Sequence, residues 1–329
     1  MLALDVGGDT ADMAELQQAQ SRAVPGLCAR DGDLYVAWSD GHQQPQQGQL
    51  LILRSSDGGV HWGHKASLGE TSEHGPAICE FNGRLYIAWT GTHEGAHLNV
   101  TSTPDGSSFS PVDKVTLKDA ASAFGPALTA FNNRLYLAWV SQDKQQIFIR
   151  SSANGTQFDR EKKFDTPSSG SPALQVAHTG SSPSGEPGAP LLLLAWTDQD
   201  QQRLGGRLHI AGSTEWPRFD GGGQIGVETS EHGPALLTAQ LAPSTASRVY
   251  IAWTGIGDRH TVNTMASDDP GKFSAGFDPI TKHTFEDRSS LDGPSLMGLF
   301  NDAQPKFFMG YTQLDPPHHL EVKPWQPGP

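Results

Sequence analysis

Residues 125–139 read GPALTAFNNRLYLAW, and five further copies of this stretch run through the chain. The intervals between the copies grow along the chain from about 50 to about 58 residues, a period that is typical of β-propeller blades and not of helical solenoids. The repeat therefore decides the architecture. The copies end at one shared aromatic position, occupied by Trp38, Trp89, Trp139, Trp196, Trp253 and Tyr311.

Each repeat has the sequence signals of four strands. In each repeat after the first, the first strand begins at a Gly-Pro or Ser-Pro step, as at Pro126, and a β-branched and aromatic run such as residues 85–89 forms the second strand. A third run, such as residues 98–102, and a weaker fourth, such as residues 114–117, complete the unit. We predict an all-β fold, a six-bladed β-propeller of four-stranded antiparallel blades. The repeats begin near residues 24, 75, 125, 171, 233 and 293.

The sixth repeat ends early, because a Pro-rich tail follows its third strand at residues 320–325. The chain also starts before its first inner strand, with Leu2–Val6 and the residues up to Gln20. We expect this N-terminal segment to complete the sixth blade and close the ring, which removes the open strand edges. Residues 13–18 could instead form a helical turn. Residues 1–329 are then one domain, since each repeat packs only on its neighbours.

Composition excludes several classes of partner. The net charge of −13 argues against nucleic acid and against an anionic membrane. No run approaches 18 apolar residues, and the start has no basic region followed by an apolar one, so we expect a soluble chain without a signal peptide. Both a cytoplasmic location and secretion after processing fit these features. Cys28 and Cys79 fall at equivalent positions of two first strands and are expected to be buried free thiols.

A compact turn follows the third strand of the first repeat, where residues 55–62 read SSDGGVHW. Its carboxylate can accept backbone N–H bonds, and its glycines can adopt positive φ. The turn resembles the Asp-box, or BNR repeat, of sialidase-superfamily propellers. In that family these turns are structural and lie opposite the active site. The resemblance implies such a role for Ser55, Asp57, Gly59 and Trp62, and for Asp105 and Asp269 in shorter copies.

The catalytic residues of the sialidase family do not carry over. That family clamps a carboxylate with three arginines and uses an Asp acid/base with a Tyr–Glu nucleophile. Its first arginine would fall at Ala23, and Arg22 lies one place early. The five tyrosines lie inside second strands, so none is left as a nucleophile at the mouth. Three further arginines belong to turns on the Asp-box face: Arg84, Arg134 and Arg248.

The opposite face carries the candidate site. Strand alternation brings the residues before each first strand together with the loops between second and third strands, and we call this face the mouth. We call the two residues before each first strand a rim pair. The second and fifth repeats share the phrase TSEHGPA. The rim pairs are Arg22/Ala23, Glu73/His74, Ala123/Phe124, Ser169/Gly170, Glu231/His232 and Leu291/Asp292.

Histidines and acids gather in the loops of the mouth. Imidazole and carboxylate groups can bind a divalent metal or hydrogen-bond sugar hydroxyls. A divalent cation in the central channel therefore remains an alternative. We assign no metal ligands, because only His93 and His97 are closely spaced in the sequence and they lie across a loop. His74 and His232 could equally be repeat residues that bond a neighbouring blade. The loop residues are His42, His93, His97, His260, His318, His319, Asp40, Glu94, Asp258 and Asp315.

The residues favour a non-catalytic binding module for a glycan or other small polar ligand. The phrase at residues 85–91 also resembles bacterial sialidase-like and lectin-like propellers, which implies loops presented to a glycan or a protein. A glycosidase or lyase that uses Glu73 or Glu231 as acid/base is the alternative, and a protein-interaction scaffold is a third. Phe124 is the candidate stacking ring. The predicted ligand-binding residues are Arg22, Glu73, His74, Phe124, Glu231, His232 and Asp292.

Overall fold

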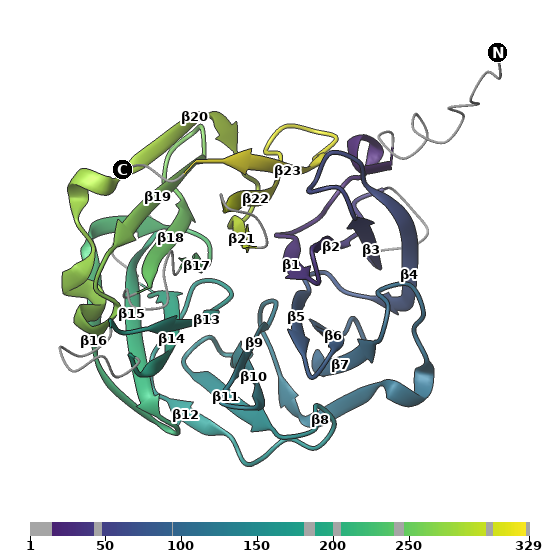
Figure 1. The fold of residues 1–329 in the computed structure, drawn as a ribbon, viewed down its shortest axis with the longest axis horizontal. Coiled ribbons are helices and arrows are strands. Elements are labelled where there is room, and N and C mark those ends of the chain that lie inside the picture. The colour runs from purple at the N-terminus through teal and green to yellow at the C-terminus, as the bar shows by residue number, and fades with distance from the viewer. Residues whose placement is uncertain are drawn as a thin grey trace.

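The computed structural model describes residues 15–42, 48–93, 95–180, 188–199, 205–239, 247–300 and 305–326. Six antiparallel sheets stand around a central axis, and the prediction of a six-bladed β-propeller is confirmed (Figure 1). Five sheets have four strands, and the sheet β21-β22-β23 has three. Connections within each sheet run between sequence neighbours, so every blade is a meander. No helix among the described residues is both long and apolar enough to cross a bilayer.

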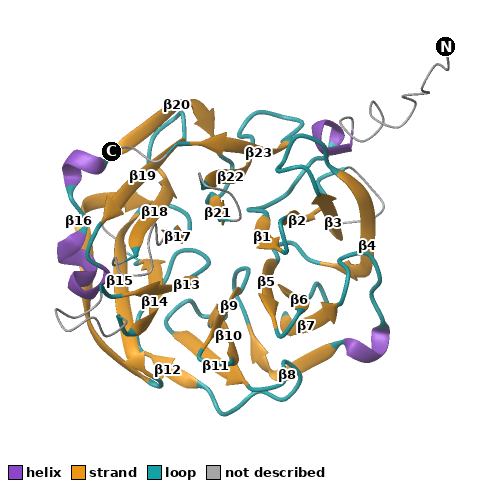
Figure 2. Cartoon of the chain, viewed as in Figure 1, coloured by secondary structure: helices purple, strands orange, loops and turns teal. Residues whose placement is uncertain are grey.

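The strands follow the repeat, and loops and turns join them around the ring (Figure 2). Blades one to three contain β1 Gly26–Arg30, β2 Asp33–Ser39, β3 Gln49–Ser55, β4 Gly63–Thr71, β5 Ala77–Phe81, β6 Arg84–Thr90, β7 His97–Thr103, β8 Val115–Ala121, β9 Ala127–Phe131, β10 Arg134–Val140, β11 Ile147–Ser152 and β12 Lys162–Phe164. Blades four to six contain β13 Ala173–His178, β14 Pro190–Thr197, β15 Gly206–Glu215, β16 Arg218–Ser230, β17 Ala235–Ala239, β18 Arg248–Thr254, β19 Thr261–Ser267, β20 His283–Ser289, β21 Ser295–Leu299, β22 Lys306–Thr312 and β23 Leu320–Trp325.

Within the described ranges, three short 3-10 helices lie on the outer edge of the ring (Figure 2): η1 Pro111–Asp113, η2 Pro270–Gly276 and η3 Pro279–Thr281. Each connects a third strand to the fourth strand of the same blade.

The core lies between neighbouring blades. Second strands such as β6 and β10 are almost wholly buried, because they have blade neighbours on both faces. Five of the six aromatic residues that end the repeats are buried in this core, as Trp89 and Trp253 show at 1% exposure, and Trp196 is half-buried and packs against it. Each repeat is thus one packing unit, since each blade buries its two faces against the two blades that flank it.

The N-terminal segment pairs with the last blade, as expected for ring closure. Gln20 forms an antiparallel bridge with His319, the Ser21 N–H donates to the His318 carbonyl at 3.0 Å, and Leu320 N–H donates to the Ala19 carbonyl at 2.9 Å. Residues 15–18 are helical, which agrees with the alternative of a helical turn. Leu2–Val6 lies outside the described residues.

Candidate functional site

A narrow cavity of about 140 Å³ lies on the ring axis. Its wall is built from the starts of the six inner strands, which include one proline from every blade. Sites for small ligands usually enclose about 300–1,000 Å³, so this cavity is smaller than such a site. The prolines are Pro25, Pro76, Pro126, Pro172, Pro234 and Pro294.

The rim pairs have a fixed backbone. A buried serine precedes each pair, and in four blades a threonine from the preceding blade donates to the carbonyl of the second rim residue at 2.7 Å. Thr90 holds Phe124 in this way, and Thr254 holds Asp292. The ring therefore presents variable side chains at equivalent backbone positions, a rigid base for a binding site.

His232 and Asp292 meet across two blades. His232 follows β16, Asp292 precedes β21, and the imidazole Nδ1 lies 3.3 Å from Asp292 Oδ1. Asp292 also accepts backbone N–H bonds from Gly293 at 2.7 Å and from Val24 at 3.3 Å. Desolvation raises the pKa of Asp292, but His232 and these amides outweigh it and leave the pKa below its ordinary value. The carboxylate is thus ionised when His232 binds to it.

His74 occupies the equivalent place in blade two but has a different neighbour. Its ring packs edge-on against Phe124, with the ring centroids 6.2 Å apart. Burial lowers the pKa of His74, while Asp292 and Glu73 act against this shift and Lys144 adds to it. His74 is therefore a neutral imidazole at neutral pH, able both to donate and to accept a hydrogen bond. Asp292 therefore contacts His232 and also favours the charged form of His74 electrostatically.

Phe124 is less open than the sequence analysis expected. Its ring is half-buried, because His74 packs on one edge and the Lys144 ammonium lies 5.0 Å from the ring centre. Such a cation–π contact adds a positive charge to the mouth. Sequence reasoning did not single out Lys144. Lys144 occupies the turn just before the third strand, where blade five has His260. An alignment of these turns between the repeats could have identified it.

The remaining predicted residues are more exposed. Arg22, Glu73 and Glu231 project as exposed side chains beside their buried rim serines. His42 pairs with Asp40 in the loop of blade one, at 2.6 Å between Nδ1 and Oδ1. Glu94 lies outside the described residues. The structure brings together His232 with Asp292 and His74 with Phe124, and it joins His260 to Glu231 and His232.

That third association is the one group among the described residues that could hold a metal ion. One ligand atom each from Glu231, His232 and His260 lies within 4.8 Å of the others. His93 and His97, the pair considered in the sequence, do not form such a group within the described chain.

The turns opposite the mouth are held by their own hydrogen bonds. Asp57 Oδ1 accepts the N–H groups of Val60 at 3.1 Å and His61 at 3.0 Å, and the Ser55 hydroxyl at 2.8 Å. Asp105 accepts two N–H groups in the same manner. The shortened turn at Asp269 retains one such bond, from Gly271. These carboxylates hold the backbone of their own turns, and their oxygens already accept its N–H groups.

The residues that sialidase chemistry would need are buried or paired. All five tyrosines are at most 5% exposed, and burial raises the pKa of Tyr35, Tyr136, Tyr250 and Tyr311. The three turn arginines pair with aspartates on their own face: Arg84 with Asp113, Arg134 with Asp159 and Arg248 with Asp268.

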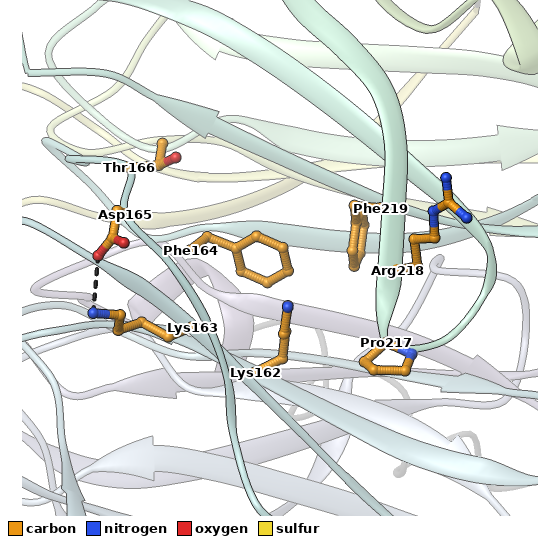
Figure 3. Close-up of a pocket in the computed structure, with 8 residues that line it drawn as sticks. All are labelled: Lys162, Lys163, Phe164, Asp165, Thr166, Pro217, Arg218 and Phe219. Carbon is orange, nitrogen blue, oxygen red and sulfur yellow. Dashed lines mark ion pairs between the residues drawn. The ribbon is translucent and has the colours of Figure 1, made fainter.

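A second cavity, of about 430 Å³, lies at the outer edge of the ring between blades three and four (Figure 3). The rings of Phe164 and Phe219 line it, 5.2 Å apart and nearly perpendicular (Figure 3). Lys162 and Arg218 border it, and Lys163 pairs with Asp165 at 3.0 Å. It has no residue in common with the rim.

Comparisons with known proteins identify the fold. No protein-family model matches the chain, and no curated protein matches it in sequence. The GH93 α-L-arabinofuranosidase of Fusarium graminearum superposes with a TM-score of 0.66 at 12% identity, over 92% of this chain and 93% of that one. The NanB sialidase of Streptococcus pneumoniae gives 0.67 at 9% identity, over 94% and 68%. A protein of unknown function from Dyadobacter fermentans gives 0.58 at 12% identity, over 93% and 94%.

Proposed function

We propose that this six-bladed, sialidase-like propeller binds carbohydrate at its mouth without acting on it. The observation that carries the proposal is the presence of two contacting pairs of rim residues, His74 with Phe124 and His232 with Asp292, set on a fixed backbone above the axial cavity. Neutral imidazole and carboxylate groups complement the hydroxyls of a sugar, because each hydroxyl both donates and accepts. Lys144 and Arg22 suit a sugar that carries an acidic group.

The similar structures support a carbohydrate ligand and leave its chemistry to be tested. The GH93 neighbour was solved with arabinobiose and another neighbour is a sialidase, so this type of ring accommodates glycans. The burial of the five tyrosines supports a mouth without sialidase-type hydrolysis, since a sialidase-type tyrosine nucleophile must reach the substrate.

Glycan-array screening followed by calorimetry tests this function. We expect sugar binding that falls at least tenfold in His74→Ala and in Glu73→Gln, because each loses groups that face the mouth. Asp31→Asn is the matched control, since Asp31 is an exposed turn residue with positive φ on the opposite face. No binding at millimolar sugar, or equal loss in the control, would refute the proposal.

A glycosidase or lyase is the competing function, and one observation favours testing it. Glu231 is an exposed carboxylate next to His232, a pairing that acid/base catalysis can use. Turnover of a panel of chromogenic glycosides and uronic-acid polymers, abolished in Glu231→Gln, would replace the binding proposal with this one. No turnover across the panel would support a non-catalytic mouth.

A further inference from the structure

The cluster of Glu231, His232 and His260 has a property that hydrogen bonding within the protein leaves unexplained. His232 Nε2 and His260 Nδ1 are buried atoms, and neither has a hydrogen-bond partner. Buried ring nitrogens are normally paired, because an unpaired polar atom loses its water without compensation. Their residues belong to the same three-residue group, in which one ligand atom of each residue lies within 4.8 Å of the others.

Asp292 orients one of these rings. Its carboxylate lies 3.3 Å from His232 Nδ1, so this nitrogen carries the proton and Nε2 is left as a lone-pair donor. Histidines that bind metals usually donate their other ring N–H to a carboxylate in this way. This contact thus leaves Nε2 available for a cation.

Blade two provides an internal comparison. It has the same phrase, with Glu73 and His74 in place of Glu231 and His232, but Ala96 stands where blade five has His260. Ala96 and His260 both have φ of 44°, and the carbonyl of each accepts the N–H of its rim serine. The positive φ is therefore a property of the repeat.

The second rim residue of the next blade differs as well. In the blade after His74 this residue is Phe124, whereas in the blade after His232 it is Asp292. The site of blade five thus combines an imidazole at the His260 position with an orienting carboxylate from blade six, and blade two has neither at the equivalent places. Shared ancestry of the phrase accounts for Glu231 and His232, but it does not account for His260 and Asp292.

We propose that blade five binds a divalent transition-metal ion, with zinc as the best fit, through His232 Nε2, His260 Nδ1 and the Glu231 carboxylate. Two imidazoles and one carboxylate form a donor set that zinc accepts, and three protein ligands leave one position for water or a ligand oxygen. Glu231 is exposed, so that position faces the mouth. Asp292 is a positioning residue. This inference goes beyond the proposed sugar binding and does not depend on it.

Titration of the chelator-treated full chain with Zn²⁺ by calorimetry tests the proposal, and Co²⁺ supplies a spectrum. We expect one high-affinity equivalent of Zn²⁺, and with Co²⁺ the visible absorption of a four- or five-coordinate imidazole site. His260→Ala should weaken Zn²⁺ binding at least 100-fold and abolish the Co²⁺ band. This variant should fold, because alanine already occupies the same backbone conformation at Ala96.

His74→Ala is the matched control, because it removes the equivalent imidazole from the blade without the cluster. Its Zn²⁺ affinity should stay within about threefold of the original. Asp292→Asn should weaken binding by about 10- to 100-fold, the usual effect of losing a carboxylate behind a ligating histidine. Equal affinities in the original chain and His260→Ala, or equal losses in His74→Ala and His260→Ala, would overturn the proposal.

Discussion

Asp57 shows how one side chain organises a turn. Its Oδ1 collects two backbone N–H groups and the Ser55 hydroxyl. Burial alone would raise the pKa of Asp57, but these bonds and the His61 ring outweigh it and lower the pKa from 3.8 to about 2. Asn154 accepts the same pattern of bonds in blade three, from Thr156 at 3.0 Å and Gln157 at 2.9 Å. The turn therefore needs an acceptor oxygen more than it needs a charge.

Replacing Asp57 should separate these two contributions. Asp57→Ala should lower the free energy of unfolding by about 2 kcal/mol, because two N–H groups lose their acceptor. Asp57→Asn, the control suggested by Asn154, should cost less than half as much at neutral pH. Urea denaturation at pH 7 measures both, and equal losses would contradict the argument.

The same variants give a pH test. The folded-state pKa of Asp57 lies below its ordinary value, so its ionisation stabilises the fold above about pH 4 and this stabilisation is lost as pH falls toward 2. Between these values the original chain should lose more stability than Asp57→Asn. Parallel curves of unfolding free energy against pH would show that the carboxylate charge is not involved.

Packing between elements explains why glycine recurs in these turns. A Cβ on Gly106 would lie 2.6 Å from Tyr35, and one on Gly155 would lie 2.2 Å from Tyr86. Each turn thus rests on an aromatic residue in the second strand of the preceding blade. Blade four has lost the turn, and there Trp216 packs on Tyr136 at 5.1 Å instead. A glycine turn in one blade and a tryptophan in another thus cover the equivalent aromatic residue of the preceding blade, because this contact between blades must be buried throughout the ring.

Gly155→Ala should therefore be costly, and Gly83→Ala should measure the backbone part of the cost. Both glycines have positive φ, of 75° and 72°, but no atom lies within 4 Å of a Cβ at Gly83. We expect Gly83→Ala to cost about 1–2 kcal/mol from backbone strain. Gly155→Ala should cost about 1–3 kcal/mol more from the clash with Tyr86. Similar urea midpoints for the two variants would show that packing of the Gly155 turn on Tyr86 does not contribute to stability.

The backbone hydrogen bond that closes the ring also occurs between the other blades. The N–H of five of the six rim serines reaches back to the turn of the preceding blade, as Ser72 does to Gly48 and Ser122 to Ala96. Ser21 makes this bond to His318, so the N-terminal segment ends blade six as the other serines end their blades. Ala19 is 3% exposed and packs in the cluster that joins blades six and one.

Ala19→Asp should loosen this junction, whereas Gln18→Asp should not. The first places a charge in an apolar cluster, which costs several kcal/mol, while Gln18 is exposed one residue earlier. We expect the thermal midpoint to fall clearly in Ala19→Asp alone, followed by circular dichroism. If both variants melt like the original chain, residues 19–21 do not close the ring.

The sequence by itself determined the number of blades, their meander topology and the aromatic core, because these depend on local periodicity that each repeat states again. It also identified His74, His232 and Asp292 as rim residues. Only the tertiary structure decided which of them meet: His232 bonds Asp292 and not His74, and His260 joins Glu231. Such contacts depend on how one blade is rotated against the next and on the conformation of the turn before the third strand. Neither quantity is encoded by the spacing of residues along one strand.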